Sequence, residues 1–67
     1  MKYKYDNVTD ILVIEMSSEV PDFAEQKGNI ITHYNKDGKP IEIEILDASE
    51  TASKIINLIL VSKKRIS

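Results

Sequence analysis

The stretch "HYNKDGKPIEIEILDAS", residues 33–49, contains the patterns that decide the fold. Gly38 lies between two β-branched segments, and glycine takes the positive φ of a tight hairpin turn at little steric cost. After the turn, isoleucine and glutamate alternate over residues 41–45, which is the period of a half-buried strand. The stretch therefore predicts a hairpin whose second strand places isoleucines on one face and Glu42 and Glu44 on the other.

Two closures of this hairpin are consistent with the sequence. A two-residue turn at residues 37–38 places His33 opposite Glu42, whereas a three-residue loop at residues 36–38 places His33 opposite Ile41. The hydrophobic pattern favours the first closure, and the turn chemistry of an asparagine followed three residues later by glycine favours the second. In both cases Ile41, Ile43 and Ile45 share a face, which we expect to be the core.

Upstream of this hairpin, the sequence predicts a first hairpin and a loop. "KYKY" (residues 2–5) alternates lysine with tyrosine, and "ILVIEM" (residues 11–16) is apolar on both faces, as in a covered central strand. Residues 17–29 lack either period and contain a proline, so we expect a loop with at most a short edge strand near residues 23–26. "NIITHY" (residues 29–34) supplies the first strand of the second hairpin.

A helix is expected after Asp47. Asp47 or Ser49 can cap the first free amides, and Asp47 with Glu50 has the spacing of a capping box. Apolar residues then recur at intervals of three or four, which is helical spacing: Ala48, Ala52, Ile55, Ile56 and Ile59. An edge strand over residues 55–61 is the competing interpretation. The expected fold is α+β, an antiparallel sheet of about four strands with the helix packed on one face.

This helix is apolar beyond a single stripe. Leu58, Leu60 and Val61 lie away from the face that the other apolar residues define, so a monomer would leave them exposed. Exposed apolar patches commonly mark contacts with other proteins. We therefore expect these three residues, together with Glu42 and Glu44, to belong to an interface with a protein partner or with a second copy.

Length and composition limit the classes of protein that this chain can represent. Its 67 residues predict one small domain, residues 1–67, and the absence of cysteine fits a reducing compartment such as the cytoplasm. The longest apolar run is far shorter than a membrane span, and no signal peptide is evident. Residues 1–50 carry eleven acids against five lysines, whereas residues 51–67 carry four cations and no acid. An acidic body of this kind argues against direct binding of nucleic acid.

The acids and the single histidine offer little catalytic chemistry. A catalytic carboxylate pair needs a cleft and one acid in an apolar pocket, and neither is evident around Glu42 and Glu44. His33 has no second histidine and no cysteine with which to hold zinc. We expect no enzyme, no cofactor and no metal site, and the alternative is a small-molecule or enzymatic site on the sheet face that carries Glu42, Glu44 and His33.

Two segments, "YKYDNVTDILVIEM" and "HYNKDGKPIEIEILDAS", resemble a family of small bacterial and archaeal proteins grouped as domain of unknown function 2283. The matching positions are Tyr5, Asp6, Asp10, Leu12, Ile14, Tyr34, Asp37, Gly38, Ile43, Glu44, Ile45, Leu46, Asp47, Ala48 and Ser49. The resemblance implies a sheet with a C-terminal helix, no known enzyme activity and, for some members, an antitoxin-like role. Together these observations predict a non-catalytic protein-interaction module, antitoxin-like in one form.

Overall fold

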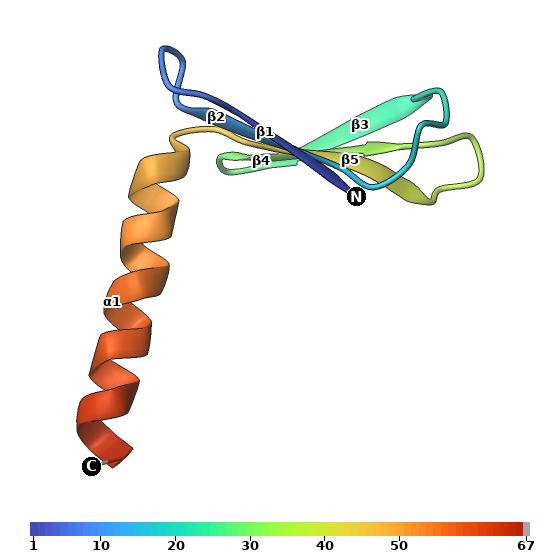
Figure 1. The fold of residues 1–67 in the computed structure, drawn as a ribbon. Coiled ribbons are helices and arrows are strands. Elements are labelled where there is room, and N and C mark those ends of the chain that lie inside the picture. The colour runs from blue at the N-terminus through green and yellow to red at the C-terminus, as the bar shows by residue number, and fades with distance from the viewer. Residues whose placement is uncertain (67) are drawn as a thin grey trace.

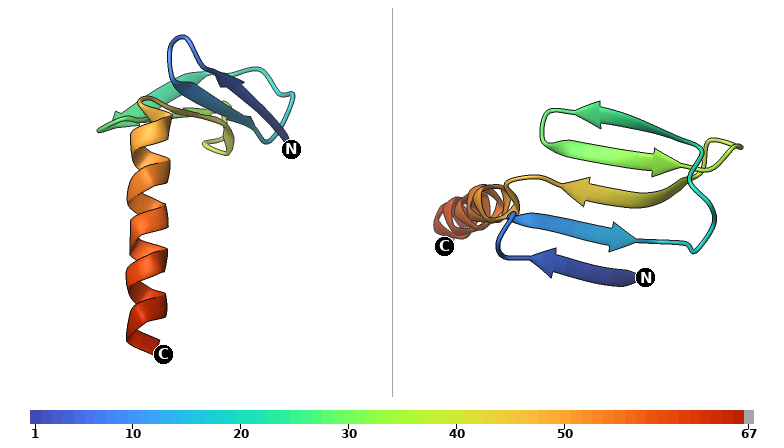
Figure 2. Two further views of the ribbon diagram at one scale, coloured as in Figure 1. Left: turned by 60° about the vertical axis from the view of Figure 1, so that its left-hand side comes forward. Right: turned by 90° about the horizontal axis from the view of Figure 1, so that it is seen from above.

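Five strands and one helix follow one another in the computed structural model, which describes residues 1–66 and the side chains of residues 1–62 (Figure 1). They are β1 (Lys2–Asp6), β2 (Ile11–Glu15), β3 (Phe23–Lys27), β4 (Ile30–Tyr34), β5 (Pro40–Ile45) and α1 (Ala48–Ile66). The strands form one antiparallel sheet in the order β1-β2-β5-β4-β3 (Figure 2). The α+β class and the C-terminal helix are confirmed. The number of strands is five, because the segment at Phe23 pairs along its whole length with β4.

The second hairpin combines the two closures that the sequence left open. Asn35 and Lys39 pair through their backbones, and the amide of Gly38 donates to the carbonyl of Asn35, so the loop itself has three residues. A bulge between His33 and Tyr34 then shifts the register by one residue. As a result His33 lies opposite Glu42, which is the pairing of the two-residue turn. The turn chemistry decides the loop, and the burial of one face decides the strand register.

The two faces of the sheet differ in composition. The register places mostly aromatic and aliphatic side chains on one face, which we call the apolar face: Tyr3, Tyr5, Leu12, Ile14, Phe23, Ile30, Thr32, Tyr34, Ile41, Ile43 and Ile45. Glu25 and Lys27 of the edge strand β3 also lie on this face. The opposite face, which we call the polar face, carries Glu15, His33, Glu42 and Glu44 beside Val13 and Ile31. Side chains alternate between faces along each strand, so this separation follows from the period of two in the sequence.

The core is small for a chain of this size. Among residues 1–62, only Ile41, 1% exposed, and Ala48, 8% exposed, are buried hydrophobic residues. β2 is half-buried throughout, which corrects the expectation of a central strand covered on each side. No second layer lies over either face in the described part of the chain (Figures 1 and 2).

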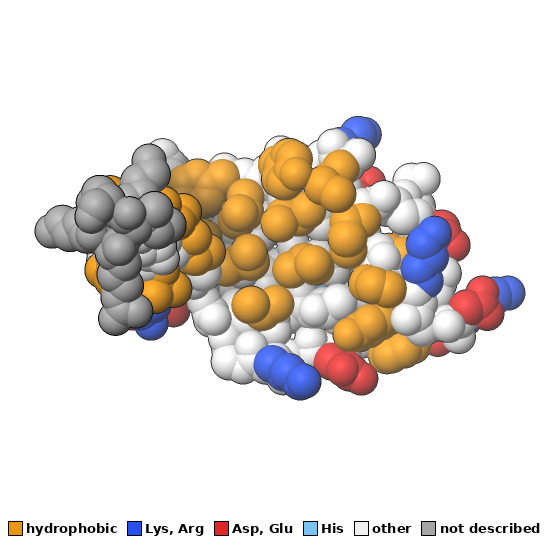
Figure 3. Space-filling view, turned by 90° about the horizontal axis from the view of Figure 1, so that it is seen from below, with side chains coloured by type: hydrophobic (Ala, Val, Ile, Leu, Met, Phe, Trp, Pro, Cys, Tyr) orange, Lys and Arg blue, Asp and Glu red, His pale blue; other side chains and the backbone are white. Residues whose placement is uncertain are grey.

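The helix does not pack on the sheet, and this overturns the expected layer arrangement. α1 leaves one end of the sheet and projects away from it (Figure 1), on the side where Figure 3 shows the apolar side chains. It makes no extensive contact with any strand, and residues 52–62 are all exposed. The predicted helix itself is confirmed, and the competing edge strand is wrong.

The dimensions of the molecule reflect this open arrangement. Its radius of gyration is 14.7 Å, whereas a compact chain of this length has a radius of about 11 Å. Its accessible surface is 5399 Å², and a folded monomer of the same mass exposes about 4,300 Å². About 1,100 Å² of surface that a compact monomer would bury is therefore exposed in the single chain.

Candidate functional site

The apolar face of the sheet is not covered by any other element of the described chain. Figure 3 shows apolar side chains gathered across it, beside the base of the helix. Tyr3, Tyr5, Phe23 and Ile30 are 67%, 52%, 43% and 39% exposed. Phe23 stacks on Tyr34, with ring centroids 5.0 Å apart, so this pair forms one corner of the face. A contiguous apolar patch of this kind is typical of a protein contact.

The helix continues this uncovered surface. Each of its large apolar residues up to residue 62 is at least half exposed: Ile55, Ile56, Leu58, Ile59, Leu60 and Val61. Successive residues of a helix are about 100° apart around its axis. One apolar sector of roughly 200° therefore contains, in order around the helix, Leu58, Ile55, Ile59, Ile56 and Leu60. A helix that lies on one sheet needs an apolar stripe only about half as wide. The apolar sector is therefore wide enough for two neighbours.

Asp10 fixes the start of the helix. Its carboxylate accepts hydrogen bonds from the backbone amide of Ser49 at 3.1 Å and from the Ser49 hydroxyl at 2.7 Å. Its backbone carbonyl accepts a bond from the amide of Ala48 at 3.0 Å. The predicted capping box is wrong, because Asp47 has a φ of 50° and offers its backbone carbonyl, not its carboxylate, to the amide of Glu50. The carboxylate that satisfies the first turn comes from the β1–β2 turn instead.

The hydrogen bonds of Asp10 shift two pKa values. The hydroxyl of Tyr5 donates to the Asp10 carboxylate at 2.7 Å. This bond, followed by the bonds from Ser49, lowers the pKa of Asp10 because each donor stabilises the ionised form. The same bond raises the pKa of Tyr5, since the phenol must keep its proton to donate. The junction is therefore built around an ionised Asp10.

Asn29 ties the helix to the sheet from the other side. Its side-chain nitrogen donates to the carbonyl of Leu46 at 2.7 Å and to the hydroxyl of Thr51 at 2.8 Å. The amide of Leu46 donates back to the carbonyl of Asn29 at 2.8 Å. The β1–β2 turn and the β3–β4 turn thus hold the segment between β5 and α1. We call the set of Asp10, Asn29, Leu46, Ser49 and Thr51 the junction.

The polar face brings three potential metal ligands together. His33 Nε2 lies 2.5 Å from Glu44 Oε1 and 3.9 Å from Glu42 Oε2. One ligand atom from each of the three residues lies within 4.8 Å of the others, and all three side chains are half-buried. Imidazole nitrogen and carboxylate oxygen are ligands of zinc and related divalent ions. The chain has no second histidine and no cysteine to hold zinc, but the register brings two glutamates to His33 instead.

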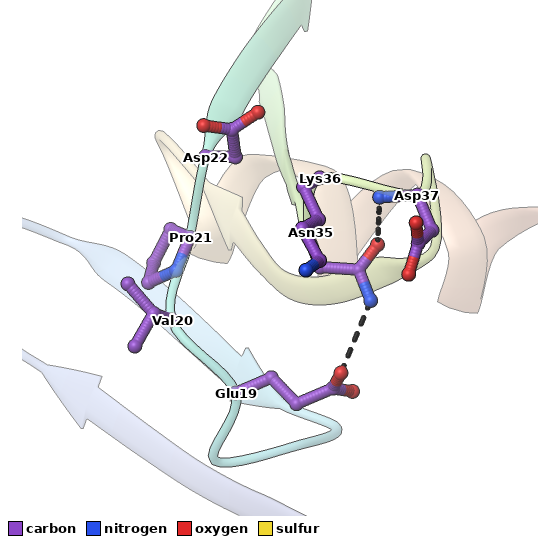
Figure 4. A pocket seen from close by; sticks show the side chains of 7 residues that line it. All are labelled: Glu19, Val20, Pro21, Asp22, Asn35, Lys36 and Asp37. Carbon is purple, nitrogen blue, oxygen red and sulfur yellow. Dashed lines mark hydrogen bonds between the residues drawn. The ribbon is translucent and has the colours of Figure 1, made fainter.

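A hollow of about 350 Å³ lies at the end of the sheet far from the helix, and the residues that line it connect two loops. Figure 4 shows Asn35 between Glu19 and Asp37 within it. Asn35 is 7% exposed; its side-chain oxygen accepts from the amides of Asp37 and Lys39, and its nitrogen donates to Glu19 at 3.1 Å. The bond from Asn35, followed by one from Ser17, lowers the pKa of Glu19. These bonds occupy Asn35, so its role is to join two loops.

The residues predicted for the interface fall on two separate surfaces. Leu58, Leu60 and Val61 lie on the exposed helix, on the side of the apolar face. Glu42 and Glu44 lie on the polar face, on the other side of the sheet. The structure therefore groups Leu58 and Leu60 with the apolar sector of the helix, places Val61 outside that sector on the side of Asn57, and groups the two glutamates with His33. The tyrosines that alternate with lysines in "KYKY" were the sequence pattern that indicated the apolar face. No local pattern indicated the hydrogen bonds of Asp10 and Asn29, because their partners lie far away in the sequence.

No helix in the described residues is long and apolar enough to cross a membrane. A family model described as "Protein of unknown function (DUF2283)" matches residues 2–49, which comprise the whole sheet and the start of the helix. No curated protein and no solved structure matches the chain.

Proposed function

The chain belongs to the family of proteins of unknown function DUF2283, and we propose that it is a non-catalytic protein-interaction module. The observation that carries this proposal is the exposure of the apolar face together with that of the helix beside it. Tyrosine, phenylalanine and isoleucine side chains of this kind form the centres of protein interfaces. The partner would cover a surface that the chain itself leaves in water.

An antitoxin is one form of such a module, and the family resemblance suggests it. Its support in this chain is charge, because residues 1–50 carry a net charge of 5 − 11 = −6. A basic ribonuclease-like toxin would meet complementary charge around the apolar contact. The partner in that case would be the product of a neighbouring gene.

Co-expression with the product of the neighbouring gene tests the interaction. We expect the two chains to copurify, and we expect Leu58→Asp to abolish the complex because it places a charge in the contact. Asn57→Asp is the matched control, since it adds the same charge at the neighbouring position on the polar side of the helix. A complex that survives Leu58→Asp and Tyr3→Asp would show that binding uses another surface.

A second candidate function is binding of a divalent metal or a small ligand on the polar face. It is favoured by the approach of His33, Glu42 and Glu44 within 4.8 Å. Isothermal titration with Zn²⁺ tests it, with one ion bound per chain as the expected result. His33→Ala should remove the binding, and Glu25→Gln, on the apolar face, should leave it unchanged. Heat that is equal in the wild-type chain and in His33→Ala would contradict a site at this cluster.

A further inference from the structure

An uncovered sheet face and an uncovered helix occur in one chain, and they are the two kinds of layer that proteins pack on each other. The helix starts at one end of the apolar face and projects on the same side of the sheet (Figures 1 and 3). We infer that a second copy of this chain covers both, with the helix of each copy lying on the apolar face of the other. This inference rests on the proposed function, because it names the partner of the same surface.

The junction favours a neighbouring chain over the helix's own sheet. Asp10 and Asn29 hold the first turn through hydrogen bonds of 2.7 to 3.1 Å to Leu46, Ser49 and Thr51. The segment 46–62 contains neither glycine nor proline at which the helix could bend back. Folding the helix onto its own sheet would break these bonds, whereas packing it on a second copy preserves them.

The exposed area agrees with the size of a stable dimer interface. The chain exposes 5399 Å², which is about 1,100 Å² more than a compact monomer of its mass. A standard interface buries about 800 Å² on each partner. One copy of the chain therefore supplies enough excess surface for such an interface, and a two-fold axis uses it on both chains at once.

The geometry of the two elements matches as well. Residues 52–62 of the helix are about 16 Å long at 1.5 Å per residue, and five strands span about 19 Å between the outer strand axes. The apolar sector of the helix covers roughly 200°, so one stripe of it can lie on the partner's sheet while a second apolar stripe stays uncovered. Because each helix stands steeply on its own sheet (Figure 1), the two helices of a two-fold dimer would cross each other, and this stripe would contact the partner's helix where they cross.

Charge adds a further reason to choose a second copy as the partner. Residues 51–67 carry four cations and no acid, whereas residues 1–50 carry a net charge of −6. A second copy therefore brings a segment of positive net charge to a partner whose residues 1–50 are acidic; Glu42 and Glu44 take no part, because they lie on the other face of that sheet. Opposite charges at the rim of an apolar contact favour association and orientation.

Sedimentation equilibrium of the full chain tests the inference, read together with the fluorescence of a dye that binds apolar surface. We expect a mass of twice 7.6 kDa and little dye binding. Leu58→Asp on the helix and Ile30→Asp on the apolar face should each halve the mass and increase dye fluorescence. The controls add the same charge elsewhere: Asn57→Asp on the polar side of the helix and Ala24→Asp on the polar face of the sheet should both remain dimeric.

The outcomes separate this inference from the proposed function. A monomer that binds the dye would overturn the second copy as partner and leave the interaction module standing. A monomer that does not bind the dye would mean that the helix covers its own sheet, and both proposals would fail. A dimer that is lost in Leu58→Asp but kept in Ile30→Asp pairs through helices alone, which overturns the reciprocal arrangement.

Hydrogen exchange on the wild-type chain keeps the inference testable if a variant fails to fold. An isolated helix of this length frays in water, so its amides are protected only when it is packed. We expect residues 52–62 to be protected in the dimer and to lose that protection on dilution to the monomer. A dimer in which these amides exchange as fast as in the monomer would contradict the packing of helix on sheet.

Discussion

The first turn of α1 and the remainder of the helix differ in how they are held. Residues 48–51 are tied to two turns of the sheet by hydrogen bonds that Asp10 accepts and one that Asn29 donates. Residues 52–62 are exposed on every side although six of them are large and apolar. The direction of the helix and the burial of its side chains therefore have separate causes. Hydrogen bonds set where the helix points, and the burial that normally stabilises a helix is missing from residues 52–62 of the single chain.

The largest expected effect on stability comes from the sheet to which the first turn of the helix is tied. Ile41 is the most buried large residue of the described chain at 1% exposed, so Ile41→Ala should lower the free energy of unfolding by about 2–5 kcal/mol. Urea denaturation measures the loss. Val8→Ala is the control, because Val8 is 89% exposed and its truncation should change stability by less than about 0.5 kcal/mol. Equal effects would mean that the stability does not reside in the sheet.

Asn35 extends the comparison to the far end of the sheet, where a buried side chain again joins two loops. Asn35→Ala leaves the amides of Asp37 and Lys39 without the oxygen that they share, so we expect a loss of about 1–3 kcal/mol by urea denaturation. Lys36→Ala, an exposed change in the same turn, should be nearly neutral. A neutral Asn35→Ala would show that water replaces the bonds and that the tie is dispensable.

The sequence predicts the elements better than it predicts their arrangement. The period of two locates β1 and β5, apolar or β-branched runs locate β2 and β4, and apolar intervals of three and four locate the helix, because all these patterns are local. The short edge strand was expected at the same place where β3 forms. These features depend only on which side of a strand or helix a residue occupies.

Features that depend on distant residues were not predictable in the same way. Asp10 caps a helix that begins 38 residues later (48 − 10), and no local rule connects the two positions. The bulge beside His33 decides that Glu42 and Glu44 meet the histidine, yet turn chemistry alone favoured the other register. The packing of the helix was mispredicted for a related reason, since amphipathic spacing indicates that a face will be buried but does not indicate by which chain.

Replacing Gly38 should change the stability of the sheet less, and only through the local backbone. Its φ is 81°, and a side chain there would meet no atom within 4 Å, so Gly38→Ala costs only the strain of the left-handed backbone. We expect a loss of about 1–2 kcal/mol, measured by urea denaturation. Gly38→Asn should cost less because asparagine tolerates this conformation better. If alanine and asparagine were equally costly, backbone strain would not be the cause.

The smallest expected change concerns the junction itself. The Asp10 carboxylate is open to water, which screens its charge, but its state can be followed at the amide of Ser49. Because folding lowers the pKa of Asp10, its contribution is fully present above the ordinary aspartate pKa of about 3.9 and is lost as the pH falls through the lower folded value. We expect the NMR signal of the Ser49 amide to shift in that acid range.

Two variants determine whether Asp10 is responsible for that shift. Tyr5→Phe removes the first donor to the carboxylate, so the pKa of Asp10 should rise toward its ordinary value and the midpoint of the Ser49 signal should move to higher pH. Asp10→Asn should abolish the transition, whereas Asp37→Asn, at the far end of the sheet, should leave it in place. A Ser49 signal that titrates unchanged in Asp10→Asn would mean that another group caps the helix. The contrast between the tied first turn and the free remainder would then need a different cause.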